Sequence, residues 1–168
     1  LSHLAEILLD MTGVQTVERS ERISLAALTD EVFCDLASVA EQKDVELIQQ
    51  EGDCIITGSY LLLYRAVYNL VENAIKYNHS GGKVTVNIHL SEEITDTSTS
   101  VNYVFLEVSD TGIGIPPEYQ EKIFTPFFRV DKSRSRAMGG AGLGLALVSE
   151  IVRQHNGQVK VLESSKKL

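Results

Sequence analysis

Residues 69–77 read Asn-Leu-Val-Glu-Asn-Ala-Ile-Lys-Tyr and carry three polar side chains at Asn69, Asn73 and Lys76. The spacing of i, i+4 and i+7 predicts that the three share one face of a helix. The other side is covered by apolar residues, namely Leu70, Val71, Ala74 and Ile75. An amide oxygen is a hard ligand that suits Mg²⁺ beside a phosphate-bearing ligand, and a lysine can reach a phosphate. Taken alone, the segment is equally compatible with a solvated helix face that happens to hold two asparagines.

Further along the chain, residues 110–117 read Asp-Thr-Gly-Ile-Gly-Ile-Pro-Pro, which predicts a turn because glycines and prolines interrupt regular structure. Asp110 ends a predicted strand, and Gly112 and Gly114 let the backbone turn sharply and approach a ligand closely. A carboxylate in this position can accept a hydrogen bond from an exocyclic amine such as that of adenine. An ordinary Asp-Gly turn between two elements is the alternative.

A second glycine-rich segment, Gly-Gly-Ala-Gly-Leu-Gly at residues 139–144, runs directly into a predicted helix. Exposed backbone N–H groups and the helix dipole make such a start an anion site. The segment is neither a P-loop nor a dinucleotide fingerprint, because no Lys-Ser/Thr pair follows and Leu145 replaces the third glycine. A packing role is the alternative, although the basic residues Lys132, Arg134 and Arg136 just before it favour phosphate.

Between the two glycine segments, residues 124–129 read Phe-Thr-Pro-Phe-Phe-Arg. The aromatic residues could simply plug the core. Alternatively, they anchor a mobile lid over a ligand, with Arg129 or Lys132 reaching a phosphate.

Hydrophobic periodicity places the remaining elements. Helices are expected over residues 24–42, with Ser24 as N-cap, over 59–78, and from the second glycine segment to His155, where Asn156-Gly157 stops it; strands are expected at 45–48, 54–57, 83–90, 103–108 and 158–162, with a long hairpin tip over 91–100. This order predicts an α/β two-layer sandwich, in which a mixed, largely antiparallel sheet packs against about three helices.

The charge balance and the apolar content of the chain exclude some classes of function. The chain has 168 residues and a formal net charge of −8, with 23 acidic and 15 basic side chains. This balance argues against a nucleic-acid or membrane-surface binder, which needs a net basic face. The sequence contains no apolar run of the roughly 20 residues that a membrane helix requires. We therefore expect a soluble domain, which could still be a piece of a larger membrane protein.

In order and spacing, the four segments resemble the N box, first glycine box, F box and second glycine box of sensor histidine kinase catalytic domains. The resemblance implies a Bergerat ATP-binding fold for residues 19–168, without its last strand. Residues 1–18 resemble the C-terminal end of a dimerisation and phosphoacceptor helix.

The resemblance also implies a role for each matching position. Asn73 would hold Mg²⁺, while Asn69 and Lys76 would contact phosphate or metal. Tyr77 would line the nucleotide pocket and Asp110 would bind the adenine amine. The other cofactor-binding positions would be Gly112, Gly114 and Ile115 near the base, Gly140, Gly142, Leu143 and Gly144 near the phosphates, and Arg129 and Lys132 in the lid. Glu72 is a candidate general base.

The implied reaction transfers the γ-phosphoryl group of ATP to a histidine on a dimerisation domain absent from this chain, for relay to an aspartate of a response regulator. The full-length protein would be a homodimer and a membrane-bound sensor with this domain in the cytoplasm. His3 lacks the neighbours of a phosphoacceptor motif, so the isolated chain is not expected to phosphorylate itself. Asn69 stands where related ATPases carry a glutamate, which disfavours hydrolysis as the main output. The alternatives are a serine kinase or anti-sigma switch of the same fold, and a non-catalytic nucleotide-binding scaffold.

Overall fold

The computed structural model describes residues 18, 20–94, 100–128 and 144–162. Its elements follow the order β1 (Glu21–Ser24), α2 (Leu25–Gln42), β2 (Val45–Gln49), β3 (Ile55–Gly58), α3 (Tyr60–Lys76), β4 (Gly82–Ile94), β5 (Ser100–Asp110), two 3-10 helices η2 (Pro117–Tyr119) and η3 (Lys122–Phe124), and α5 (Gly144–Gln154).

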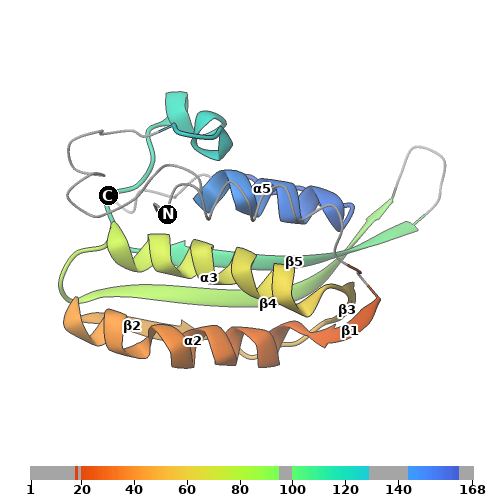
Figure 1. Ribbon diagram of the computed structural model, residues 1–168, viewed down its shortest axis with the longest axis horizontal. Helices are drawn as coiled ribbons and strands as arrows, with labels where there is room; N and C mark the ends of the chain where they lie inside the picture. The colour runs from red at the N-terminus through yellow and green to blue at the C-terminus, as the bar shows by residue number, and fades with distance from the viewer. Residues whose placement is uncertain (1–17, 19, 95–99, 129–143, 163–168) are drawn as a thin grey trace.

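The strands form a mixed, mostly antiparallel arrangement. In a three-stranded sheet of order β2-β4-β5, β2 runs parallel to β4, and β4 and β5 form a long antiparallel hairpin. A separate two-stranded antiparallel ladder joins β1 and β3. The helices α2, α3 and α5 lie side by side over one face of the sheet, with α3 in the middle (Figure 1). The predicted α/β two-layer sandwich is confirmed.

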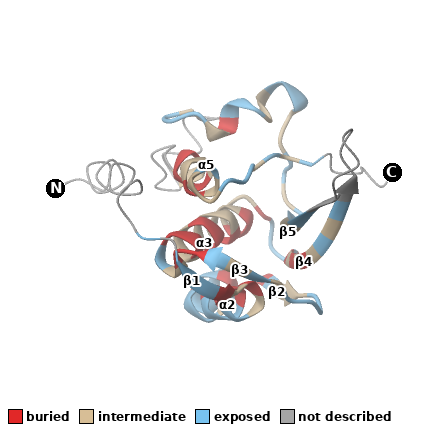
Figure 2. Ribbon diagram, turned by 90° about the vertical axis from the view of Figure 1, so that its right-hand side faces the viewer, coloured by how far each residue is buried: buried red, intermediate tan, exposed pale blue. Residues whose placement is uncertain are grey.

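The core lies between these two layers. Along β4 the apolar residues alternate, and Val84, Val86 and Ile88 are buried against the helices. The period of two places all three on one face of the strand. Opposite them, the buried side chains come from the inner faces of the three helices (Figure 2), including Leu28, Val32, Leu36, Val67, Val71, Ile75, Val148 and Ile151.

Both long helices begin at a serine, as the preference of helix starts for hydroxyl side chains predicts. The Ser24 hydroxyl accepts the Ala27 N–H at 3.1 Å, which confirms the predicted cap of α2. Ser59 caps α3 in the same way, by accepting the Leu62 N–H at 3.3 Å.

Helix α5 ends where the sequence predicts. Asn156 adopts a left-handed conformation with φ of 60°. The Gly157 N–H donates to the Val152 carbonyl and the Asn156 N–H to the Arg153 carbonyl. These two bonds satisfy carbonyls at the helix end in the pattern of a Schellman motif.

Two expectations were wrong. Residues 158–162 form no strand, since an alternating pattern alone does not supply a hydrogen-bonded neighbour, although Val159 still packs against the core. The hairpin tip is also shorter than residues 91–100, because β4 continues to Ile94 and β5 already begins at Ser100. The ladder pairs polar residues such as Glu92 with Asn102, so backbone pairing extends the hairpin beyond the hydrophobic alternation.

One element was not predicted at all. Strand β1 has four residues, of which only Ile23 is buried, and such a short segment carries too little periodicity to be recognised. It is held by its pairing with β3, in which Ile23 lies opposite Ile56.

Candidate functional site

The ends of three secondary-structure elements lie together at one edge of the fold. The C-terminal end of α3, the C-terminal end of β5 and the N-terminal end of α5 all lie at the same side of the molecule, on the left in Figure 1. These ends carry the N box, the first glycine box and the last residue of the second glycine box. The fold therefore brings together segments that are far apart in the sequence.

The turn after β5 is seated directly on the end of α3. The Gly112 N–H donates to Oδ1 of Asp110 at 2.8 Å, and the Ile113 N–H donates to the Tyr77 carbonyl at 3.3 Å. A β-carbon on Gly112 would lie 2.5 Å from the Tyr77 carbonyl oxygen, so only glycine allows this approach. Asp110 and Tyr77 are thereby held beside each other.

The start of α5 approaches the N-box face of α3. A β-carbon on Gly144 would lie 3.0 Å from Oδ1 of Asn69. The amide nitrogen of Asn69 donates to the Arg65 carbonyl at 2.8 Å, one turn earlier in α3. That bond orients the amide so that its oxygen lies beside the first residue of α5.

The remaining N-box residues are half-buried at the same end of α3. Asn73, Lys76 and Tyr77 each keep part of their surface accessible, and Tyr77 is the C-cap residue. The Lys76 carbonyl accepts a hydrogen bond from the Lys43 ammonium group, which ties this end to α2. Their partial exposure means that a ligand at this junction could reach them.

The donor set suits a magnesium ion held together with phosphates. No group of three or more His, Cys, Asp or Glu side chains gathers in the described part of the chain. Mg²⁺ in nucleotide sites needs only one or two protein oxygens, because substrate phosphates and water supply the others. The half-buried side chain of Asn73 carries an amide oxygen of this kind, so the chemistry of the residues present fits this ion.

Glu72 belongs to a different set of contacts. Its carboxylate lies near the Tyr68 hydroxyl, and burial together with this negative charge raises the pKa of Tyr68. Tyr68 continues a row with Tyr64, whose ring centroid is 6.0 Å away. Tyr64 in turn donates to Asp35 of α2, and burial and that carboxylate raise the pKa of Tyr64.

The first glycine box continues past the Asp110 turn. Gly114 has φ of +73° and open space around it, which a glycine tolerates. Ile115 is half-buried, and its carbonyl accepts from the Gln120 amide at 3.4 Å. Part of the F box is also described, with the Phe128 ring 5.6 Å from that of Tyr119. The predicted positions Arg129, Lys132, Gly140, Gly142 and Leu143 lie outside the described residues.

Two residues at this junction were not identified from the sequence. Asn78 is buried and Thr111 bonds to it, with the Thr111 hydroxyl donating to Asn78 Oδ1 at 3.1 Å. Both sit next to residues of the motifs, Tyr77 and Asp110. Adjacency to the two motifs was the available signal, but their mutual contact becomes visible only when the fold is known.

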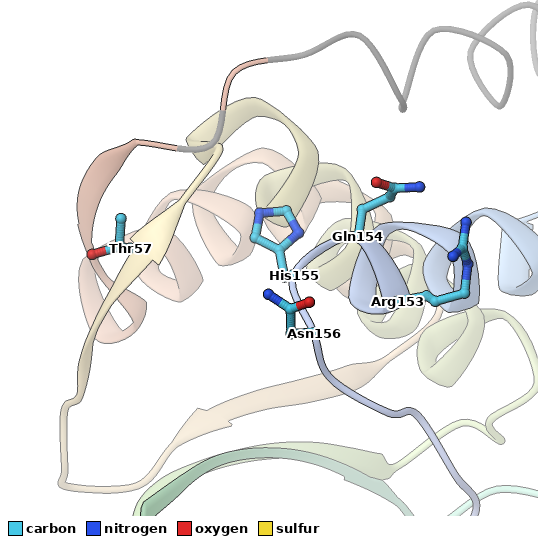
Figure 3. Close-up of a pocket in the computed structure, with 5 residues that line it drawn as sticks. All are labelled: Thr57, Arg153, Gln154, His155 and Asn156. Carbon is cyan, nitrogen blue, oxygen red and sulfur yellow. The ribbon is translucent and has the colours of Figure 1, made fainter.

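A separate hollow lies at the opposite end of α5. It has a volume of about 330 Å³ and is lined by Thr57 of β3 and by Arg153, Gln154, His155 and Asn156 (Figure 3). The charge of Arg153 is already paired with Glu150, at 2.7 Å. The hollow contains none of the predicted site residues, so it does not coincide with the junction described above.

Comparison with known proteins bears on both fold and site. The family model described as histidine kinase-, DNA gyrase B- and HSP90-like ATPase matches residues 58–167. The chain belongs to this family. The matched residues include α3, the Asp110 turn and α5, which are the elements that meet at the junction.

Individual relatives belong to a narrower class of protein than the family model describes. The sensor histidine kinase RppB of Synechocystis sp. is 36% identical over 167 residues, which cover 96% of this chain and 35% of RppB. The mycobacterial sensor histidine kinase MprB has a TM-score of 0.68 at 29% identity, over 84% of this chain and 83% of that structure. Full-length ShkA in complex with AMPPNP has a TM-score of 0.74 at 25% identity, over 96% of this chain and 32% of ShkA.

These relatives show that the chain has the Bergerat-type fold of histidine kinase catalytic domains. The chain spans about a third of the length of RppB and of ShkA, at 35% and 32%. Within the described residues, no helix combines the length and apolar character needed to span a membrane.

Proposed function

We propose that this chain is the ATP-binding catalytic domain of a two-component sensor histidine kinase. The observation that carries the proposal is the junction of the α3 end, the Asp110 turn and the α5 start. It is found in a chain that is 36% identical to a sensor histidine kinase over nearly its whole length. ShkA, which shares the fold, was crystallised with an ATP analogue, and this supports a nucleotide site here.

In this proposal the domain works as part of a longer protein. Residues 1–18 are the C-terminal end of a dimerisation and phosphoacceptor helix, and residues 19–168 are the catalytic domain. The complete protein is a homodimeric, membrane-bound sensor that keeps this domain in the cytoplasm. Its downstream partner is a response regulator.

In this proposal, the turn after β5 binds the adenine base. One oxygen of Asp110 accepts the Gly112 N–H, and the other is available to accept the exocyclic amine of adenine. Gly114 leaves room for the base, Gly112 lets the turn pack against Tyr77, and Ile115 and Tyr77 line the site with apolar surface. A carboxylate fixed at one oxygen is oriented before the nucleotide arrives, which lowers the entropy cost of binding.

The phosphates bind between helix α3 and the start of helix α5. Asn69 and Lys76 contact the phosphates, and Asn73 holds Mg²⁺, which neutralises phosphate charge when bound. Gly144 begins α5 and offers the positive end of the helix dipole, and the resemblance assigns further backbone N–H donors to Gly142 and Leu143. Gly140, Arg129 and Lys132 complete the lid side of the nucleotide.

The chemistry needs no nucleophile from this domain. The bond between the γ-phosphorus and the bridging oxygen breaks, a bond to an imidazole nitrogen of the acceptor histidine forms, and ADP leaves. Such transfer depends mainly on positioning and charge neutralisation. Glu72 is retained as a candidate base, although its carboxylate lies near the Tyr68 hydroxyl. At the first N-box position, Asn69 has no carboxylate with which to activate water, which favours transfer over hydrolysis.

Calorimetric titration with AMPPNP, with and without Mg²⁺, tests the proposal. We expect Asp110→Asn to weaken binding and Asn73→Asp to alter its metal dependence. Asp110→Asn keeps an oxygen to accept the Gly112 N–H, so the turn is preserved. Asp30→Asn, at an exposed position of α2, is the matched control. Absence of binding to the folded native chain would contradict the proposal and favour a non-catalytic scaffold.

A further inference from the structure

A buried asparagine stands at the base of the proposed adenine site. Asn78 is 5% exposed, and each end of its amide is used. Its Oδ1 accepts the His79 N–H at 2.9 Å and the Thr111 hydroxyl at 3.1 Å, while its Nδ2 donates to the Lys83 carbonyl at 3.0 Å. A buried amide with all these partners is rigid, because losing any of them would leave a desolvated polar group.

Thr111 completes the network from the other side. Its hydroxyl accepts the Lys83 N–H at 2.9 Å while donating to Asn78, and its own N–H donates to the Lys83 carbonyl at 3.2 Å. The side chain therefore links the loop after α3 to the first residues of β4 and to the end of β5. No apolar side chain of the same shape can make these bonds.

The network needs a glycine beside it. A β-carbon on Gly82 would lie 2.1 Å from Asn78 Oδ1, so the close packing of the asparagine is built into the start of β4. The glycine and the asparagine together bring Lys83 within reach of Thr111.

Asp110 lies between two fixed points as a result. On one side it pairs with Val84, the last pair of the β4–β5 ladder at this end. On the other side, Thr111 is hydrogen-bonded to Asn78 and Lys83. The Gly112 N–H donates to Asp110 Oδ1. Among the described residues, no hydrogen bond goes to the other oxygen, Oδ2.

From this arrangement we infer that Asn78 and Thr111 are positioning residues that fix the Asp110 carboxylate and thereby set the preference of the site for adenine. The inference rests on the proposed nucleotide site. Adenine offers an amine donor to the carboxylate, whereas hypoxanthine has a carbonyl oxygen at the same place and would repel it. A polar group can discriminate in this way only when it cannot move away from the wrong base.

The test compares AMPPNP with its inosine counterpart by calorimetry, in the presence of Mg²⁺. Thr111→Val removes the hydroxyl with little change of shape, and Thr111→Ala removes it without adding an apolar branch against Asn78. Thr111→Ser keeps the hydroxyl and is the conservative rescue. Thr57→Val, at an exposed position of β3 beside the separate hollow, makes the same chemical change away from the site.

The native chain should prefer the adenine nucleotide. Thr111→Val and Thr111→Ala should lower that preference by about fivefold, the factor that corresponds to one lost hydrogen bond. Thr111→Ser and Thr57→Val should retain it. The ratio of the two affinities is the informative quantity, because a variant that merely loosens the fold weakens both nucleotides equally.

An unchanged ratio in Thr111→Val and Thr111→Ala would overturn the inference while leaving the nucleotide site intact. Equal binding of both nucleotides to the native chain would also overturn the inference, because Asp110 would then not distinguish the amine of adenine from the carbonyl of hypoxanthine. Absence of binding by either nucleotide would instead reject the proposed function on which the inference rests.

Discussion

Gly112 packs so closely on Tyr77 that a β-carbon would lie 2.5 Å from the Tyr77 carbonyl oxygen. This contact seats the turn after β5 on the end of α3, and it joins two motifs that the sequence keeps apart. The proposed nucleotide site depends on it, because Asp110 belongs to the turn and the N box to the helix.

Gly112→Ala should therefore damage the site and the fold together. We expect the free energy of unfolding to fall by about 1–3 kcal/mol, as for other overpacked positions, and nucleotide binding to weaken. Denaturant unfolding and calorimetry measure the two effects. Gly81→Asn is the control, since Gly81 has φ of +81° with nothing within 4 Å, and asparagine tolerates that conformation. Equal behaviour of the two variants would contradict the proposed contact.

At the far end of α5, His155 holds the start of α3. Its Nε2 accepts the Ser59 N–H at 3.0 Å, so Nδ1 must carry the proton that is donated to the Ile151 carbonyl at 2.7 Å. Figure 3 shows this ring beside the strand that bears Thr57. The imidazole thus joins both helices in one defined tautomer.

His155→Ala should leave the N–H of the buried Ser59 without this acceptor. The expected loss of unfolding free energy is about 1–3 kcal/mol, the cost of a buried unsatisfied donor. His79→Ala, at an exposed position, should change it by less than about 0.5 kcal/mol. Comparable losses in both variants would show that the His155 bond does not stabilise the domain.

Asp53 should make stability depend on acidity. It accepts the Ala26 N–H at 2.9 Å and the Ser24 hydroxyl at 2.7 Å, and these bonds lower its pKa below the ordinary value of 3.8. The pKa of Asp53 is therefore lower in the folded state than in the unfolded state. Its carboxylate contributes to the free energy of unfolding above pH 3.8, and this contribution is lost as the pH falls through the folded pKa.

Denaturant unfolding across this range should show the advantage of the native chain over Asp53→Asn shrinking as the solution is acidified. Asp30→Asn, in an exposed position of the same helix that Asp53 caps, serves as the reference variant. A gap between native and Asp53→Asn that stays constant from neutral to acidic pH would rule out this role for the Asp53 carboxylate.

The isolated chain should bind nucleotide without phosphorylating itself. Its four histidines are followed by Leu, Ser, Leu and Asn, and none begins a phosphoacceptor motif. After incubation with γ-labelled ATP and Mg²⁺, we expect no acid-labile label on the protein, while calorimetry on the same sample shows binding. Robust labelling would mean that an acceptor lies within this chain.

Much of the fold could be predicted from local patterns. The helix periodicity and the serine before Leu25 located α2, and the alternation of Val84, Val86 and Ile88 located β4. Such features are decided by neighbours along the chain. Strand β1 was missed and residues 158–162 were misassigned because a strand is defined by its partner, which local sequence does not specify.

The same limit applies to the site. The motifs predicted Asn69 and Asp110 as site residues from their chemical type and spacing, and the fold places both at the junction. Asn78 and Thr111 were not identified, because their role arises from a contact across 33 positions of sequence. A network of that kind becomes apparent only when β4, β5 and α3 are placed together.

Chemical-shift changes of backbone amides on addition of Mg²⁺ and AMPPNP would locate the nucleotide site residue by residue. We expect the largest changes over residues 69–78 and 110–114, with little effect around the hollow lined by Thr57, His155 and Asn156. Changes centred on that hollow, with the Asp110 turn unaffected, would contradict a nucleotide site at the junction.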